Sequence, residues 1–504
     1  MDDTVLVAGG GLAGLSCALS LGRAGFDVTL FESASELGGK AGARKPREGE
    51  RFPAAIEHGP HFFAAWYRNL LSLMDRIGTD GHLVGYDGYH FLLPSQRLSG
   101  GTEGGTARAS ASLSFLAGLV ADGDAGPLTW TTAVRGLALA LDLLTARERP
   151  ALDEISLTGY VHSRWYGDAA LAALADEQVR RATVVPAPLV STQTMSRLLR
   201  LWFRHPRPLL SVLDTDLASG VIEPLASEAA KVANVNVDTP VDGLVLDDDR
   251  IAGLRLASGE ELRGAATVSA VPVEVIQRWL NDRVGAADPR LMALQRLRTA
   301  PMACVQLAFD RSVGEIPPGV IYLAESRPLI NLIDLSQVWR SLAGGPGTVL
   351  SLVLPDYDQL RGLSQERQLE LVLDELERYF PSLADASLTD AIVQQHVDRP
   401  RFMHTVGVWS SRPSPEQAYG AAPESRGGLY VCGDWTQTPI DLACMESAVL
   451  SGLLTAAALA KRYGREPGIQ PLLPAADGRL RRASYRLAKL VSAPLAAAGK
   501  LAER

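Results

Sequence analysis

The residues Val5-Leu6-Val7-Ala8-Gly9-Gly10-Gly11-Leu12-Ala13-Gly14 decide how this chain folds. The four apolar residues predict a buried parallel strand, the glycines predict a tight turn, and residues 15–24 predict a helix that crosses back. A second apolar strand, residues 28–31, follows this helix and ends at Glu32. Strand, helix and strand in this order form a βαβ unit, so we predict an α/β fold with a parallel sheet.

The glycines of this turn have the spacing of a dinucleotide site. Gly9 permits the sharp turn, Gly11 lets a pyrophosphate approach the backbone, and Gly14 lets the helix pack closely on the strand. The positive N-terminal end of the helix attracts the pyrophosphate, and Glu32 can accept both hydroxyls of an adenosine ribose. The residues predicted to contact the dinucleotide here are Gly9, Gly11, Leu12, Ala13, Gly14 and Glu32.

Length, charge and cysteine content limit what the chain can do. Its 504 residues, 47% of them hydrophobic, suffice for two or three folded units and a large apolar cavity. A formal net charge of −8 argues against a nucleic-acid partner. No secretory signal precedes the first strand, so we expect a cytoplasmic protein. The cysteines have no metal-ligand spacing, which predicts free thiols and no metal site; they are Cys17, Cys304, Cys432 and Cys444.

A second glycine turn, Leu37-Gly38-Gly39-Lys40, follows the βαβ unit. It fits two interpretations. It is either an ordinary surface loop or a second contact with a diphosphate, in which the glycines expose backbone donors and Lys40 neutralises charge. Its place next to the βαβ unit favours the second.

Residues 56–63, Ile-Glu-His-Gly-Pro-His-Phe-Phe, hold two histidines around a glycine. For His58 we favour a buried turn in which the histidine is satisfied. There is no room for a long side chain at Gly59, and we place it with the cofactor-contacting residues. His61 is the one polar side chain that we nominate near the reacting centre.

The middle of the chain is apolar and helical. A glycine-rich loop at residues 99–108 separates it from the opening fold. Residues 128–144 are interrupted by charges and fall short of the ~20 residues that cross a bilayer, so we predict no membrane span there. Together with residues 198–203 they form either plain core or the wall of an apolar pocket or interfacial surface.

The second half of the chain returns to the nucleotide and adds a further sheet. Residues 429–432 predict a buried strand that ends at Gly433 and Asp434, and a helix opens at Met445. A second strand, acid and helix N-terminus can hold another polar stretch of an extended cofactor, which predicts FAD rather than a nicotinamide dinucleotide. Other short strands are predicted at residues 234–237, 241–246, 251–256, 267–270 and within 303–353, with an amphipathic helix at 365–379.

These motifs resemble the FAD-dependent amine oxidase and phytoene desaturase superfamily over nearly the whole chain. Lys40, His61-Phe62-Phe63 and residues 445–452 look most like the plant and cyanobacterial phytoene and ζ-carotene desaturases. Residues 433–436 and 446–448 also look like bacterial hydroxysqualene dehydroxylases. The resemblance implies a Rossmann-type, glutathione-reductase-like FAD-binding domain with an inserted α+β substrate domain.

The resemblance also implies roles for single residues. Val241 would contact the adenine through its backbone, Asp434 the ribityl or diphosphate region, and Met445 the pyrimidine edge of the flavin. The stretch Pro439-Ile440-Asp441 is one residue longer than in the plant desaturases, so contacts there do not transfer. The further FAD-contacting residues so implied are Gly38, Gly39, Lys40, Gly59, Val241, Gly433, Asp434 and Met445.

We therefore expect an FAD-dependent oxidoreductase that desaturates a long apolar isoprenoid or polyene by hydride transfer to flavin N5. Loss of hydride leaves a delocalised cation, so the following proton loss needs only a weak base, and positioning does most of the work. A quinone or oxygen would accept the electrons. The alternatives are a hydroxysqualene dehydroxylase-like enzyme, a flavin scaffold without chemistry, and an amine oxidase. Amine oxidases usually carry two aromatic residues around the amine, at places that are Asp441 and Cys444 here.

The basic C-terminal tail combines Arg479, Arg481, Arg482, Arg486 and Lys489 with leucines at helical spacing. It either packs back on the domain or lies in the headgroup layer of a membrane, on the inner face of the cell membrane. The predicted bounds are 1–98, 223–298 and 403–465 for the FAD-binding domain, 99–222 for a mainly helical substrate- or membrane-facing region, 299–402 for the substrate domain, and 466–504 for linker and tail.

Overall fold

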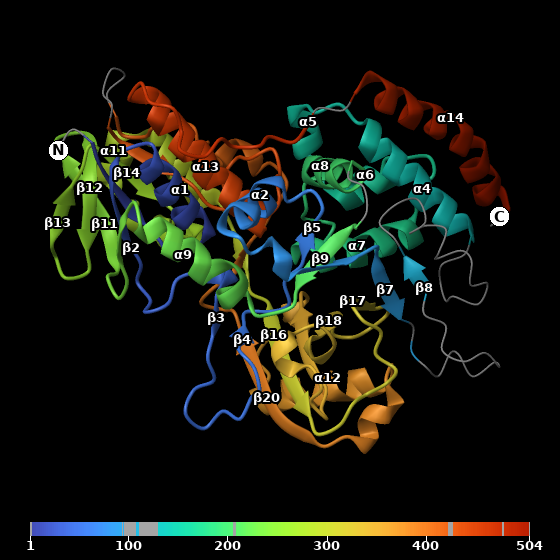
Figure 1. Ribbon diagram of the computed structural model, residues 1–504. Coiled ribbons are helices and arrows are strands. Elements are labelled where there is room, and N and C mark those ends of the chain that lie inside the picture. The colour runs from blue at the N-terminus through green and yellow to red at the C-terminus, as the bar shows by residue number, and fades with distance from the viewer. Residues whose placement is uncertain are drawn as a thin grey trace.

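The computed structural model describes residues 3–92, 94, 107–109, 130–204, 208–421, 427–475 and 478–502. Figure 1 shows a nucleotide-binding region that carries the N-terminus, a second sheet below it, and a helical region beside it. Most of the predicted loop at 99–108 lies outside the described residues.

The nucleotide-binding region is built on a five-stranded parallel sheet in the order β10-β2-β1-β14-β22. Val7 of β1 lies opposite Leu30 of β2 and Val268 of β14, and all three side chains are buried. Sequence-distant segments thus meet in one sheet, as the predicted return of the chain requires. The strands are β1 (Thr4–Ala8), β2 (Asp27–Phe31), β10 (Asn234–Asn236), β14 (Ala266–Ser269) and β22 (Leu429–Val431).

Two helices, α1 (Leu12–Arg23) and α13 (Met445–Arg462), pack against each other on this sheet. Gly452 permits the contact, because a Cβ there would lie 2.2 Å from the carbonyl oxygen of Ala13. Close packing brings both helix N-termini to the same side of the sheet. The flanking helices are α2 (Arg68–Ile77), α9 (Glu223–Ala230), α10 (Val273–Trp279) and α11 (Asp282–Ala287).

The predicted strands at 241–246 and 251–256 do not join the parallel sheet. They pair with each other and with a third strand in a separate antiparallel sheet. This sheet comprises β11 (Val241–Asp247), β12 (Arg250–Leu256) and β13 (Glu261–Arg263).

The second large sheet has seven strands in the order β20-β16-β19-β18-β17-β7-β8, with α12 (Gln365–Glu377) packed on it. One feature corrects the predicted domain bounds: β7 belongs here, although residues 1–98 were assigned to the FAD-binding domain, because β7 pairs in parallel with β17. The strands are β7 (Tyr89–Leu92), β8 (Ala107–Ala109), β16 (Ala303–Phe309), β17 (Val320–Leu323), β18 (Ile330–Asp334), β19 (Val349–Leu354) and β20 (Leu388–Gln395).

The described residues also form two short strand pairs and one three-stranded sheet. These are β3 (Ala43–Arg44) with β4 (Ile56–Glu57), β15 (Thr299–Ala300) with β21 (Arg401–Phe402), and β9 (Leu210–Leu213) between β5 (Phe63–Ala64) and β6 (Leu83–Tyr86).

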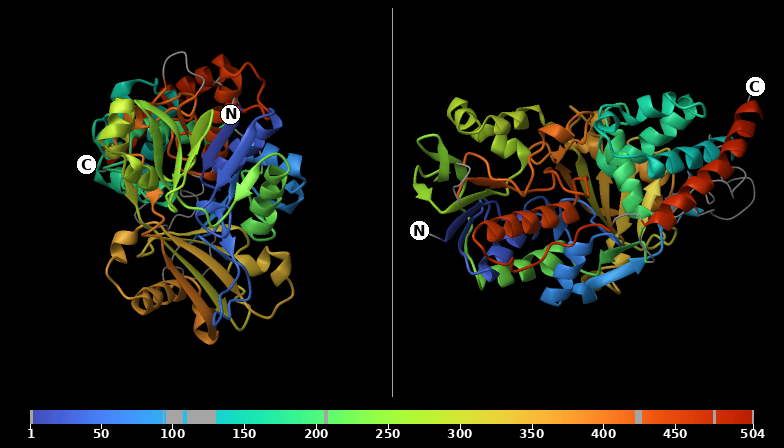
Figure 2. Two further views of the ribbon diagram at one scale, coloured as in Figure 1. Left: turned by 90° about the vertical axis from the view of Figure 1, so that its left-hand side faces the viewer. Right: turned by 90° about the horizontal axis from the view of Figure 1, so that it is seen from above.

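The C-terminal helix α14 (Arg479–Ala502) is long and packs on α4 (Trp130–Thr145) of the helical region. Figure 2 shows α14 along the outer side of this region, at the end of the molecule opposite the N-terminus. Over the described residues, no helix is both long and apolar enough to cross a membrane. The other helices here are α5 (Pro150–Asp153), α6 (Leu157–His162), α7 (Ala169–Thr183) and α8 (Thr192–Trp202).

Candidate functional site

One cavity of about 970 Å³ runs between the nucleotide-binding region, the seven-stranded sheet and the helical region. Of the residues nominated from sequence, only Gly14 does not line it. The structure therefore brings together segments from both ends of the chain. The nominated residues that line the cavity are Gly9, Gly11, Leu12, Ala13, Glu32, Gly38, Gly39, Lys40, Gly59, His61, Val241, Gly433, Asp434 and Met445.

The first glycine turn leaves room for a ligand at one position and none at another. A Cβ on Gly14 would lie 1.9 Å from the carbonyl oxygen of Gly9, so Gly14 serves helix–strand contact. A Cβ on Gly11, at the N-cap of α1, would meet nothing closer than 3.8 Å. The open space at Gly11 beside the N-terminus of α1 fits a diphosphate group.

The second glycine turn lies directly against the first. The Gly38 amide donates to the carbonyl of Gly10 at 2.9 Å, and a Cβ on Gly39 would come within 3.4 Å of Gly11 Cα. Both glycines line the cavity, which supports the second-contact interpretation over an ordinary loop. Lys40 differs from the expectation, because its Nζ already pairs with Glu274 at 3.0 Å and donates to the Pro400 carbonyl at 2.5 Å.

Glu32 also has partners within the protein. Its Oε2 accepts the Gly10 amide at 2.6 Å and its Oε1 accepts the Ala34 amide at 2.9 Å. The carboxylate thereby fixes the glycine turn while it lines the cavity.

We predict that Glu32→Ala lowers the affinity for FAD by roughly tenfold or more, since hydrogen bonds to a charged group contribute about 1.5–3 kcal/mol. The flavin-to-protein ratio after gel filtration measures it. Glu36→Ala, which removes an exposed carboxylate from the same cavity wall, is the matched control. Equal ratios in the two variants would mean that Glu32 is no cofactor ligand.

The histidine turn separates into two different environments. His58 is hydrogen-bonded on both ring nitrogens, to Gln394 at 3.3 Å and to Arg399 at 2.9 Å, and burial lowers its pKa to about 4. It is the satisfied histidine that we favoured. His61 lines the cavity, and its Nδ1 lies 3.6 Å from a Glu57 carboxylate oxygen. Its catalytic role stays a prediction.

The N-terminus of α13 points into the cavity through Cys444 and Met445. Glu446 behind them faces away, where it accepts the backbone amides of Asn69 and Leu70 at 3.0 and 2.9 Å. Burial raises the pKa of Glu446 to about 7. Its carboxylate ties the start of α2 to the start of α13, a role that the sequence motif alone did not reveal.

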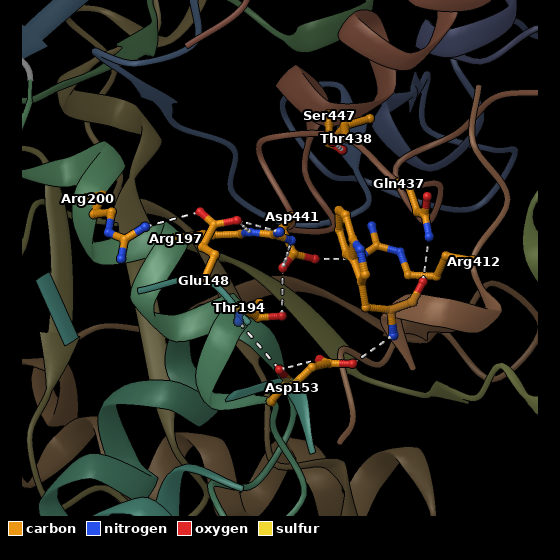
Figure 3. Close-up of polar contacts among 12 residues, drawn as sticks. Glu148, Asp153, Thr194, Arg197, Arg200, Arg412, Gln437, Thr438, Asp441 and Ser447 are labelled. Carbon is orange, nitrogen blue, oxygen red and sulfur yellow. Dashed lines mark hydrogen bonds and ion pairs between the residues drawn. The ribbon is translucent and has the colours of Figure 1, made fainter. Parts of the chain in front are cut away.

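Asp441 lies outside the cavity, in a buried ion cluster that Figure 3 shows. It contacts Arg412, and it accepts from Arg197 Nη1 and from Thr194 Oγ1, each at 3.0 Å. Arg197 also pairs with Glu148 at 2.8 Å. The cluster fastens the loop before α13 to α8, and it holds Asp441 outside the cavity lining.

Much of the remaining cavity wall is apolar and aromatic. Trp202 packs edge-on against Trp66 at 5.8 Å, and Tyr89 stacks on Tyr322 at 4.9 Å. Helices α4, α7 and α8 supply the aliphatic wall, so the structure supports the pocket-wall interpretation for residues 198–203 and for the described part of 128–144, which begins at residue 130. The aliphatic lining residues from these helices include Leu139, Leu143, Leu171, Leu174, Val179, Leu198 and Leu199.

The chain matches the model of a known protein family. The model of the family described as flavin containing amine oxidoreductase matches residues 12–460. The 15-cis-phytoene desaturase of Synechococcus elongatus is 26% identical over 91% of this chain and 96% of its own length. The carotenoid phi-ring synthase of Streptomyces griseus is 29% identical over 91% of this chain and 88% of its own.

Among solved structures, the cyclohexylamine oxidase of Brevibacterium oxydans superposes with a TM-score of 0.66 at 16% identity, covering 92% of this chain and all of that one. This likeness concerns the fold alone, and it agrees with the predicted α/β architecture with an added domain.

Proposed function

The chain belongs to the flavin-containing amine oxidoreductase family, an FAD-dependent enzyme family, and from that premise we propose that it desaturates a long apolar isoprenoid or carotenoid-like polyene. The observation that carries the proposal is the large aliphatic and aromatic chamber that adjoins the glycine turns. Its aliphatic walls suit a hydrocarbon chain, and its aromatic walls suit a polyene.

The relatives named as phytoene desaturases support the substrate class. Asp441 argues against an amine oxidase. At the sequence position where an amine oxidase usually has an aromatic residue, this chain has Asp441, which belongs to an ion cluster. Cys444, at the second such place, does line the cavity, but as a thiol. We therefore place the desaturase ahead of the amine oxidase and of the dehydroxylase.

FAD, when bound, supplies the hydride acceptor. The residues that would hold it are Glu32 and the two glycine turns at the adenosine and diphosphate end, and Asp434 with the start of α13 at the flavin end. The chain's own contribution is to align the substrate in an apolar chamber and to keep water out. His61 is the polar group that we propose for receiving the proton, because it lines the cavity and its Nδ1 lies 3.6 Å from a Glu57 carboxylate oxygen.

Anaerobic mixing tests the substrate class. Phytoene dispersed in detergent should bleach the flavin absorbance of the purified protein, whereas putrescine or cyclohexylamine should leave it unchanged. Bleaching by the amines and not by the polyene would replace the desaturase with an amine oxidase. Reoxidation of the bleached protein with a quinone and, separately, with oxygen then identifies the electron acceptor that we propose from these two.

We further propose that α14 rests on a membrane surface from which the substrate is drawn. Its inner side packs on the protein, where Tyr485 meets Phe203 and Lys489 contacts the buried Asp142. Its outer side presents apolar side chains with high exposure, together with exposed arginines. The exposed fractions are 88% for Leu480, 64% for Leu487 and 72% for Leu490.

We predict that replacing Leu480, Leu487 and Leu490 together by Gln weakens sedimentation with anionic liposomes by at least ~tenfold, because buried apolar area sets the binding strength of such helices. FAD content should not change, since the three side chains are largely exposed and do not line the cavity. Truncation after Gly478 should lose sedimentation likewise. Full sedimentation of both variants would assign α14 a purely structural role.

A further inference from the structure

Arg401 places a guanidinium in the cavity at the start of α13. Its backbone is fixed by pairing of β21 with β15, where Arg401 lies opposite Ala300. Its Nη2 donates to the carbonyl of Ala443, one residue before the N-cap of α13, at 2.7 Å. Both Arg401 and Ala443 line the cavity.

Among the residues that the structure describes, Arg401 has no carboxylate within ion-pair distance. The groups that act on its charge are Cys444, Asp434 and Tyr67, and burial lowers the pKa of Arg401 from its ordinary value. An arginine stays protonated even so. Burial also raises the pKa of the Cys444 thiol to about 12, so Cys444 is neutral. Within the described part of the chain, Arg401 forms no ion pair with a carboxylate.

Arg401 is half-buried, and a cation that is partly removed from water without a partner is unfavourable unless an anion joins it. Two other cations of the cavity wall differ in this respect. Lys40 pairs with Glu274, and Arg181 pairs with Glu177 and donates to Asn331. Among the described residues, Arg401 is therefore a cavity cation at the α13 end with no carboxylate in ion-pair contact, and Asp434 acts on its charge without such a contact.

At the position of Arg401, the negative charge that we expect is that of the flavin rather than that of the diphosphate. The diphosphate is expected at the N-terminus of α1, beside Gly11. Arg401 lies at the N-terminus of α13. The positive end of this helix dipole and the guanidinium both favour a negative charge at this place.

We propose that the Arg401 guanidinium faces the pyrimidine edge of the bound flavin and offsets the negative charge that this edge gains on reduction. In that reduction a substrate C–H bond breaks, its electron pair moves with the hydrogen to flavin N5, the substrate is oxidised, and the flavin gains one negative charge. Arg401 thus raises the reduction potential. This inference rests on the proposed placement of the flavin at α13.

The test is the midpoint potential of protein-bound FAD, titrated against a reference dye with no isoprenoid present. Its outcome is therefore independent of the substrate assignment. Arg401→Met should shift the reduction equilibrium by about 100-fold toward oxidised flavin, or about −60 mV for two electrons, while Arg401→Lys retains most of the wild-type potential. Arg278→Met, which removes a cavity-wall cation on α10, should leave the potential unchanged.

An unchanged potential in Arg401→Met overturns the proposal. A second outcome also overturns the proposal: Arg401→Met binds less FAD, but the FAD that stays bound keeps the wild-type potential. That outcome would assign Arg401 to the diphosphate. If Arg401→Met does not fold, Arg401→Gln carries the same test, since Gln keeps a donor for the Ala443 carbonyl and removes the charge.

Discussion

Gly11→Ala is expected to give a folded protein that has lost most of its FAD. Gly11 has φ −77° and ψ −179°, which any residue adopts, and a Cβ there would meet no protein atom within 3.8 Å. The added methyl group instead occupies the space that a diphosphate needs to approach the backbone. We expect the affinity for FAD to fall by ~100-fold, about 2.7 kcal/mol, and the melting temperature of the apoprotein to stay the same.

Gly14→Ala is the matched control, with the opposite pattern. Its Cβ would lie 1.9 Å from the Gly9 carbonyl oxygen, so α1 must move away from β1. Such overpacking costs about 1–3 kcal/mol, and the apoprotein should melt at a lower temperature. Full FAD retention in a well-folded Gly11→Ala protein would place the diphosphate elsewhere.

The second large effect concerns stability. Asp441→Asn removes the charge between Arg412 and Arg197 while Asn tolerates the left-handed backbone at this position, φ +50°. Removal of one member of a buried ion pair costs about 3–5 kcal/mol, because the remaining charges stay buried without compensation. Urea denaturation should show a loss in the free energy of unfolding of this size.

Glu148→Gln is the control for this variant. Glu148 also pairs with Arg197, but its side chain is 47% exposed, so its loss should cost at most about 1 kcal/mol. Similar losses in the two variants would contradict the view that Asp441 is the centre of the cluster.

The local parts of the site could be predicted from the sequence. Neighbouring residues determine the conformation of a glycine turn between a strand and a helix, and they indicate which ligand it binds. Both glycine turns line the same cavity. The same holds for the strand that ends at Gly433 and for the helix that opens at Met445. The structure gives these residues their expected neighbours, and their contacts with FAD stay predictions.

What the sequence did not reveal depends on contacts between distant residues. Glu446 was visible only as part of a motif, and its bonds to Asn69 and Leu70 arise because α2 and α13 pack together. Arg401 and Arg412 were not singled out, since an isolated arginine carries no signal of burial. Residues 1–98 were placed in the FAD-binding domain as one stretch, and only the pairing of β7 with β17 shows that β7 belongs to the other sheet.

The central claim is that the chain oxidises carbon–carbon bonds of an apolar isoprenoid with FAD. The most direct measurement is the mass and absorbance spectrum of the product formed when the purified protein, with a quinone or oxygen, is incubated with phytoene in liposomes. We predict a product lighter by two hydrogens for each desaturation, with absorbance at longer wavelength, and none of it from the Gly11→Ala protein. Recovery of unchanged phytoene from the flavin-containing protein, with an amine substrate consumed instead, would contradict the account.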